Sequence, residues 1–194
     1  MSKKRGLSFY EKKKIISKGM VREIFSMIFS CFAAVLLAFV IVLSFGLKTS
    51  VIGVSMEPAL SNGQTVFIDR FIYKLTSPKR GDVIVFLPNG NTNSHYYLKR
   101  VVALPGETVQ IIDGYVYVNG VMLDEDETLD KIADPGMAEF EITLGSEEFF
   151  VLGDNRNNSE DSRSGNIGSV KKSNIIGKAW FHLSGEEDGW GFVE

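Results

Sequence analysis

The 194-residue chain contains one cysteine and two histidines. With Cys31 alone, no disulfide can form within the chain, so a packed core must stabilise the fold. His95 and His182 are too few for most metal sites built from histidine. Neither the EF-hand spacing nor the GK[ST] motif of a phosphate-binding loop occurs in the loop at 153–163, and repeats and low-complexity tracts are also absent. With 44% hydrophobic and 23% charged residues, the composition is typical of a folded protein.

Charge is absent from the 24 residues between Ile24 and Leu47. As a helix this run would be about 36 Å long, enough to cross a hydrocarbon core of about 30 Å. It has no polar face, which argues against a buried globular helix. The alternative is a cleavable signal peptide, but its apolar region would be about 7–15 residues, and the following GLKTSVIG has no clear cleavage site. We therefore predict an uncleaved transmembrane helix over 24–47.

Acidic residues are scarce in the N-terminal segment. Residues 1–23 hold eight of the 21 Lys and Arg but two of the 24 Asp and Glu, so the rest of the chain has a net charge of −9. By the positive-inside rule, this basic segment lies in the cytoplasm and the body lies outside. We expect a single-pass protein of the cell membrane. Ser55 follows Leu47 by eight residues, a link of at most about 26–29 Å, and is therefore expected near the outer membrane surface.

Residues 48–194 are rich in β-branched and aromatic residues, which favours an antiparallel β fold. Two hairpin dipeptides, Asp113-Gly114 and Asn119-Gly120, divide residues 108–123 into a three-stranded meander. The acidic segment 124–136, DEDETLDKIADPG, follows it and is interpreted as a solvated loop. Further strands are predicted at 65–73, 82–87, 96–104, 139–144, 148–153 and 175–183. These elements divide the body into a β core, 48–105 plus 146–194, and a small β insert, 106–145.

A serine stands in the stretch GVSMEPAL, residues 53–60. The Ser55 hydroxyl is a poor nucleophile unless a base removes its proton. Gly53 permits unusual backbone dihedrals, and Pro58 favours an extended residue before it, so this loop is able to hold the hydroxyl in a fixed place. Taken alone the signal is weak, because most serines in such positions are turn or cap residues.

Lys99 lies in HYYLKRVVALPGE, residues 95–107, a strand that alternates poorly and is therefore expected to be covered on both faces. Burial disfavours an ammonium group and lowers its pKa, and a neutral amine can act as a general base. The ordinary alternative is a lysine that extends to solvent. Arg100 faces the other side and is interpreted as a structural ion-pair former.

A third stretch, GDNRNNSEDSR at 153–163, concentrates polar residues after an apolar strand. Ion pairs and side-chain-to-backbone bonds within the loop explain this composition from the residues alone. Asn157-Asn158-Ser159 also matches a glycosylation sequon, a triplet that is common by chance.

Together these stretches, in this order behind one N-terminal anchor, resemble a type I signal peptidase of the Gram-positive type, a membrane serine protease with a Ser/Lys dyad. SMEPAL resembles the nucleophile box, YYLKRVVALPGE the box of the general base, RGDVIVF the strand before it and GDNRNNSEDSR the last box. The resemblance covers most of residues 48–183.

The resemblance implies roles for individual residues. Ser55 takes the place of the nucleophile and Lys99 that of the general base. Ser159 matches the serine that orients the lysine, and Asp161 and Arg163 match the supporting ion pair, while Asp154 and Arg156 also occupy motif positions. Where some members have a second oxyanion serine this chain has Gly53, so the oxyanion would rely on the Ser55 N–H with a Gly53 backbone contribution. Ala59 replaces a frequent threonine, with little effect expected.

The implied reaction removes N-terminal signal peptides from exported precursor proteins, cutting after a small-x-small pattern. It requires no metal or organic cofactor, and its partners are signal peptides and membrane lipid, without nucleic acid; the sequence does not indicate an oligomeric state. Three other classes of protein compete with this interpretation. A non-hydrolytic assembly factor needs neither Ser55 nor Lys99, and a self-cleaving repressor-type protease needs a DNA-binding domain in place of an anchor. A plain anchored β domain would cleave no precursor.

Overall fold

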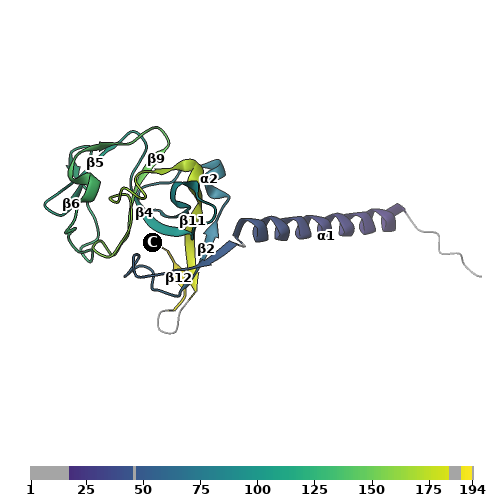
Figure 1. Ribbon diagram of the computed structural model, residues 1–194. Coiled ribbons are helices and arrows are strands. Elements are labelled where there is room, and N and C mark those ends of the chain that lie inside the picture. Colours follow the sequence, from purple (N-terminus) through teal and green to yellow (C-terminus); the bar gives the residue numbers. More distant parts are fainter. Residues whose placement is uncertain (1–17, 46, 184–188, 194) are drawn as a thin grey trace, which may run out of the picture. The chain divides into compact units, whose positions relative to one another are not determined.

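The computed structural model describes residues 18–45, 47–183 and 189–193 (Figure 1). The chain divides into two compact units, Met1–Val40 and Ile41–Glu194.

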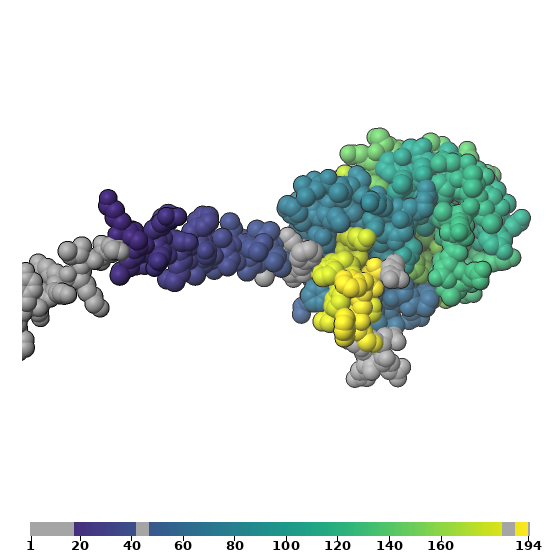
Figure 2. All heavy atoms as spheres, turned by 180° about the vertical axis from the view of Figure 1, so that it is seen from behind, coloured from purple at the N-terminus to yellow at the C-terminus, as the bar shows by residue number. Residues whose placement is uncertain are grey.

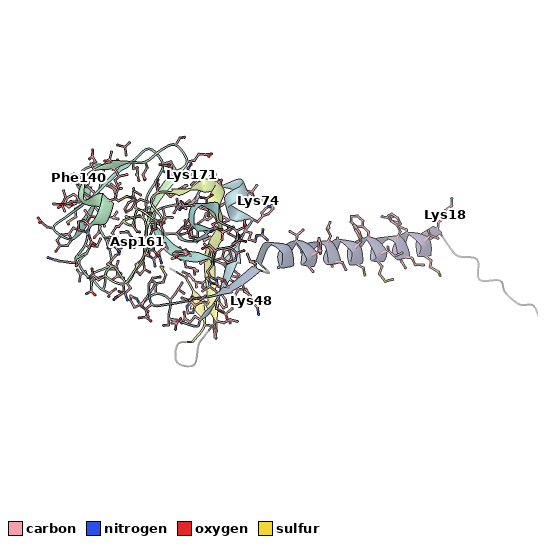
Figure 3. All side chains as sticks on the ribbon, in the orientation of Figure 1. Lys18, Lys48, Lys74, Phe140, Asp161 and Lys171 are labelled. Carbon is pink, nitrogen blue, oxygen red and sulfur yellow. The ribbon has the colours of Figure 1, made fainter. Side chains whose placement is uncertain are left out.

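The helix α1 runs from Lys18 to Phe45. It begins inside the predicted basic segment and ends before Leu47, which belongs to a strand; residues 1–17 and 46 lie outside the described residues. The side chains described for α1, from Lys18 to Ile41, are exposed on every side of the helix (Figure 3). Within the described ranges, α1 is the one helix whose length and composition allow it to cross a membrane. In a bilayer, lipid would surround these exposed apolar side chains and keep them out of water.

The second unit is built on an eight-stranded sheet in which every paired strand is antiparallel. The strand order is β1-β2-β11-β3-β4-β9-β10, with β12 paired to β11. The bounds are β1 (Leu47–Ser50), β2 (Thr65–Asp69), β3 (Val83–Phe86), β4 (Tyr97–Ala103), β9 (Glu148–Leu152), β10 (Val170–Lys171), β11 (Ile175–Leu183) and β12 (Gly191–Phe192). This confirms the predicted fold class, mainly antiparallel β. All four residues of β3 are buried, which explains why its sequence does not alternate.

A second, four-stranded sheet has the order β7-β6-β5-β8. Its strands are β5 (Thr108–Ile112), β6 (Tyr115–Val118), β7 (Val121–Met122) and β8 (Ile142–Thr143). Both turns of the predicted meander are present, with positive φ at Asp113, Gly114, Asn119 and Gly120. Positive φ at both central residues is the requirement of a type I′ turn, and it explains why these dipeptides join such short strands.

The two sheets share one apolar core. Val109 and Val116 of the smaller sheet pack in the same buried cluster as Val102 of β4 and Phe150 of β9. Figure 2 shows the segment 106–145, coloured teal to green, on one side of the unit, and the yellow C-terminal strands on another. Because the smaller sheet buries its apolar side chains against β4 and β9, it depends on the larger sheet for its core.

Two predicted strands differ from the structure. The predicted strand 65–73 ends at Asp69, because its carboxylate accepts hydrogen bonds from the N–H groups of Phe71 and Ile72 and starts the short helix α2 (Ile72–Leu75). The predicted strand 139–144 shrinks to β8, since the helical turn η2 (Gly136–Glu139) precedes it. The remaining short helical turns are η1 (Pro88–Gly90) and η3 (Lys172–Asn174).

Candidate active site

Ser55 lies in the loop that joins β1 to β2. Backbone bonds between Val51 and the Gly63-Gln64 turn close this loop at its base, and the buried side chains of Met56 and Leu60 hold it on the core. Gly53 has φ +87, a conformation that favours glycine. The loop therefore presents Ser55 on a fixed backbone.

Lys99 lies in the middle of β4, where its register partner is Ile84 of β3. Its side chain is 3% exposed, and Nζ lies 2.6 Å from Oγ of Ser55. Two residues 44 positions apart in the chain are therefore within hydrogen-bonding distance.

Burial is the largest influence on the Lys99 amine and lowers its pKa to about 8 from 10.5. The nearby carboxylates of Asp161, Asp154 and Glu160 oppose this shift, and the Arg163 cation adds to it. Removal of water disfavours the charged amine more than these carboxylates stabilise it. About one tenth of Lys99 is consequently neutral at pH 7, and a neutral amine is what a general base requires.

The carbonyl oxygen and the N–H of Ser55 differ in their hydrogen bonding. Its carbonyl oxygen accepts a hydrogen bond of 3.1 Å from the N–H of Asn155. Its own N–H has no hydrogen-bond partner among the residues that the structure describes. The Gly53 N–H, in contrast, donates to Oδ1 of Asn62 at 2.9 Å. This bond occupies the donor that the sequence interpretation gave to the oxyanion, so the structure provides the Ser55 N–H but no free N–H at Gly53.

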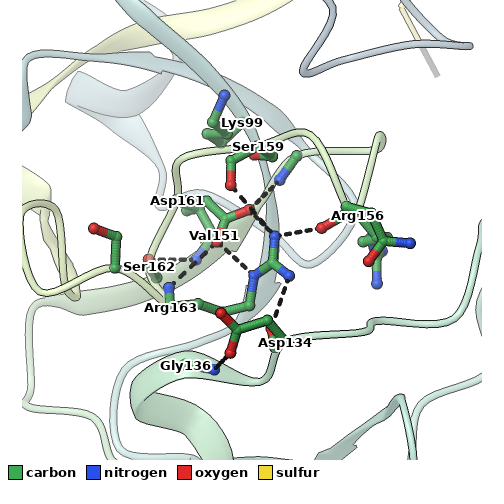
Figure 4. A network of polar contacts seen from close by, with 12 residues as sticks. Lys99, Asp134, Gly136, Val151, Arg156, Ser159, Asp161, Ser162 and Arg163 are labelled. Atoms are coloured by element: carbon green, nitrogen blue, oxygen red, sulfur yellow. Dashed lines mark hydrogen bonds and ion pairs between the residues drawn. The ribbon is translucent and has the colours of Figure 1, made fainter.

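The 153–163 loop packs beside this pair and is held by a buried ion pair (Figure 4). Arg163 donates from Nε to Oδ1 of Asp161 at 2.8 Å and from Nη2 to Oδ2 at 2.9 Å. Asp161 is fully buried and also accepts from the N–H of Gly153 at 3.1 Å. Because each charged group is paired and further hydrogen-bonded, the ion pair is satisfied inside the protein and fixes both ends of the loop.

Ser159 lies in the same loop with its hydroxyl buried, and Oγ has no hydrogen-bond partner among the described residues. The predicted bond from Ser159 to Lys99 therefore stays a prediction. Gly153 brings these parts close together, since a Cβ at this position would overlap Oγ of Ser159 and the carbonyl oxygen of Ser55. A glycine is required there for close approach of the loop to the serine backbone.

Two further ion pairs attach the loop to its surroundings. Arg100 binds the buried Asp154 in a bidentate pair, with distances of 2.8 and 2.7 Å, in agreement with its interpretation as an ion-pair former. The side chain of Arg156 is 2% exposed and pairs with Glu125 of the acidic segment. Sequence reasoning missed this contact, because it interpreted the acidic segment as solvated; Ile132 of that segment is also buried.

The described residues of the second unit line cavities of about 410 and about 560 Å³, and neither of these is lined by Ser55 or Lys99. One, of about 410 Å³, borders the end of β1 and is lined by Thr49, Ser50, Ile52, Leu87, Thr92, Ser94, His95 and Tyr96. The other, of about 560 Å³, lies between Pro58 and Ala59 on one side and the acidic segment on the other. Ile52 of the smaller cavity and Pro58 of the larger one are each three residues from Ser55, and the smaller cavity borders β1, the first strand in the order of the larger sheet.

A serine hydroxyl beside a buried lysine amine, on an antiparallel β fold, fits the class of serine peptidases that use lysine as their base. The family model for signal peptidase, peptidase S26, matches residues 24–183. The chain belongs to this family and is a serine peptidase.

Individual relatives agree with the family match. A probable signal peptidase I-2 from Synechocystis is 36% identical, over 72% of this chain and 66% of the relative. Signal peptidase I P from Bacillus subtilis subsp. natto is 33% identical, over 64% of this chain and 70% of the relative. The chain thus matches about two thirds of the length of these relatives. A crystal structure of a signal peptidase I from Enterococcus faecalis is 35% identical and aligns with a TM-score of 0.42, over 52% of this chain and 95% of that one.

Proposed function

We propose that the protein is a membrane-anchored signal peptidase I, an endopeptidase that removes N-terminal signal peptides from exported precursor proteins. Ser55 is the nucleophile and neutral Lys99 the general base. The observation that carries this proposal is the 2.6 Å distance between Nζ and Oγ, at a lysine that is 3% exposed.

Acylation starts when the Ser55 hydroxyl gives its proton to Nζ of Lys99 and Oγ attacks the scissile carbonyl carbon. The tetrahedral oxyanion accepts a hydrogen bond from the Ser55 N–H; one such donor is typically worth about 2.7–4 kcal/mol. Collapse breaks the C–N bond, and Lys99 gives the proton to the leaving amine of the mature protein. The signal peptide remains as an ester on Oγ.

Deacylation uses the same base. Lys99, again neutral, takes a proton from water as that water attacks the ester carbonyl. The ester C–O bond then breaks, Oγ regains the proton from Lys99, and the signal peptide leaves with a free carboxylate. In this scheme Ser159 orients Nζ, while Asp161 and Arg163 hold the loop that carries Ser159.

The substrate proposal follows from the family resemblance and from the cavity at the end of β1. An extended peptide with small side chains one and three residues before the cut would run beside this strand and present its carbonyl to Ser55. The apolar helix α1 would confine the enzyme to the bilayer that also holds the apolar segment of the precursor. Confinement raises the effective concentration of the cleavage site without new contacts.

The proposal is tested by incubating the detergent-solubilised protein with a model precursor and reading the products by mass spectrometry. We expect one cut after a small-x-small pattern with the wild type. Ser55→Ala should give no cut, because it removes the nucleophile. Lys99→Arg should give none either, because a guanidinium does not deprotonate in this pH range. Circular dichroism of each variant checks that it remains folded. Precursor cleavage by folded Ser55→Ala would contradict the proposal.

A further inference from the structure

The acidic segment, residues 124–136, reaches the 153–163 loop through a buried cation. The guanidinium of Arg156 donates from Nη1 to Oε2 of Glu125 at 2.9 Å and from Nη2 to Oε1 at 2.6 Å. Nε of Arg156 is buried and has no partner within the part of the chain that the structure describes. Glu125 is therefore the carboxylate that compensates this buried charge, and a bidentate pair also fixes the direction of the arginine.

The same segment holds the loop at two further places. The side chain of Asn157 accepts from the N–H of Ala133 at 2.9 Å and donates to the carbonyl oxygen of Lys131 at 3.0 Å. Arg163 donates from Nη1 to the carbonyl oxygen of Asp134 at 3.2 Å (Figure 4). The segment thus contacts the loop at Arg156, Asn157 and Arg163. Of these three residues, Arg156 lies nearest in sequence to the loop residue that contacts the Ser55 backbone.

That contact is the bond from the Asn155 N–H to the carbonyl oxygen of Ser55. Arg156 follows Asn155 directly, and its own carbonyl oxygen accepts a bond of 2.6 Å from Nη2 of Arg163. Arg156 also lies inside the turn that the bond from the Asn158 N–H to the Asn155 carbonyl oxygen closes at 3.1 Å. A displaced Arg156 side chain would therefore shift the amide that holds the Ser55 backbone.

We propose that Glu125 is a positioning residue for the nucleophile: it fixes Arg156, and through Arg156 and Asn155 it fixes the backbone of Ser55. This inference rests on the proposed peptidase function. It assigns to the insert a part in the reaction, although no insert side chain is proposed to contact the reacting atoms. A misplacement of about 1 Å at a reacting group can cost on the order of 100-fold in rate.

The test compares Glu125→Gln, which keeps the shape and removes the charge, with Glu127→Gln, which makes the same charge change at an exposed neighbour. Steady-state kinetics of the full chain in detergent are measured on a model precursor from pH 6 to 9. We expect Glu125→Gln to lower kcat by about tenfold at every pH, with KM within about twofold of wild type. The acid limb of the pH–rate profile should keep its midpoint, because Glu125 is not among the groups that shift the pKa of Lys99. Glu127→Gln should match the wild type.

Thermal melts separate positioning from stability. A lowered melting temperature with wild-type kcat below the transition would overturn the inference, and so would a raised KM at unchanged kcat. If Glu125→Gln does not fold, Glu125→Asp decides, since it keeps the charge and shortens the side chain; we expect kcat to fall by about threefold, and a wild-type kcat would overturn the inference. If wild type and Glu127→Gln also fail to cleave the precursor, the proposed peptidase function is contradicted together with the positioning role. If both of them cleave it, the kcat of the Glu125 variant tests the positioning role alone.

Discussion

At the scale of single residues, burial separates Lys99 from the other lysines. Among the lysines that the structure describes, it is the one whose side chain is buried, and its partner is a neutral hydroxyl. A salt bridge would keep the amine charged, whereas a hydroxyl in a dry site favours the neutral form. The chemistry of the site thus depends on where the strand β4 puts this one side chain.

The pKa of Lys99 predicts the pH dependence of the reaction. Because burial lowers it to about 8, the amine loses its proton as the pH rises through that value. About one tenth of the enzyme would hold a neutral base at pH 7. We expect kcat/KM to rise about tenfold per pH unit below 8 and to level off above it. Initial rates between pH 5.5 and 9.5 measure this, and a rate independent of pH over that range would contradict a lysine base.

Gly153 provides a test of the close approach between the 153–163 loop and Ser55. Gly153→Ala introduces a Cβ that overlaps Ser159 and the Ser55 carbonyl, so the loop must move. We expect a loss of stability of about 1–3 kcal/mol and a fall in kcat of at least about tenfold. Gly165→Ala is the matched control, since its Cβ meets its nearest atom, Sδ of Met137, at 3.9 Å. Denaturation and cleavage assays check both variants. Equal stability and equal kcat of the two variants would contradict the close packing of Gly153 against Ser159 and Ser55.

At the scale of elements, the shared core makes the two sheets of the second unit depend on each other. Phe150 of β9 is 1% exposed and packs with the apolar residues of the smaller sheet, whereas Phe140 is 74% exposed (Figure 3). We expect Phe150→Ala to lower the free energy of unfolding by about 3–5 kcal/mol, and Phe140→Ala by about 0.5 kcal/mol or less. Chemical denaturation measures both. A second, separate transition for the insert would contradict a common core.

The sequence predicted elements where local chemistry decides the conformation. Asp113-Gly114 and Asn119-Gly120 specify their turns whatever surrounds them, and the apolar run of α1 is long enough to be unambiguous. The strands β10 and β12 have two residues each, too few for a periodic pattern, and exist because longer strands offer them an edge. The strand predicted through residue 73 failed because the Asp69 side chain competes for backbone N–H groups.

The site itself was predicted by resemblance more than by pattern. No local rule brings Ser55 to Lys99, 44 residues away; the pairing of β3 with β4 and the fold of the nucleophile loop do so. Glu125 was missed for a related reason. In sequence it is one of several acids in a turn-rich segment, and only the packing of the 153–163 loop distinguishes it from Glu127, which is exposed.

At the scale of the whole molecule, the basic N-terminal segment and the apolar helix α1 predict one orientation in the membrane. In a Cys31→Ser background, we expect Lys171→Cys, at an exposed position of β10, to react with a membrane-impermeant maleimide in intact cells. Lys12→Cys, in the basic segment, should react only after lysis. The reverse pattern of labelling would contradict an N-terminus in the cytoplasm.

The proposed mechanism depends most on the protonation state of the Lys99 amine. It is measured by NMR titration of the full chain in detergent, with lysine labelled at Cε and Lys99→Arg used to assign the signal. We predict a midpoint for Lys99 near pH 8, well below the 10.5 of an ordinary lysine. A midpoint at or above 10 in the folded protein would show that burial does not lower the pKa of this lysine, and it would contradict the role of Lys99 as the base that takes the proton of Ser55.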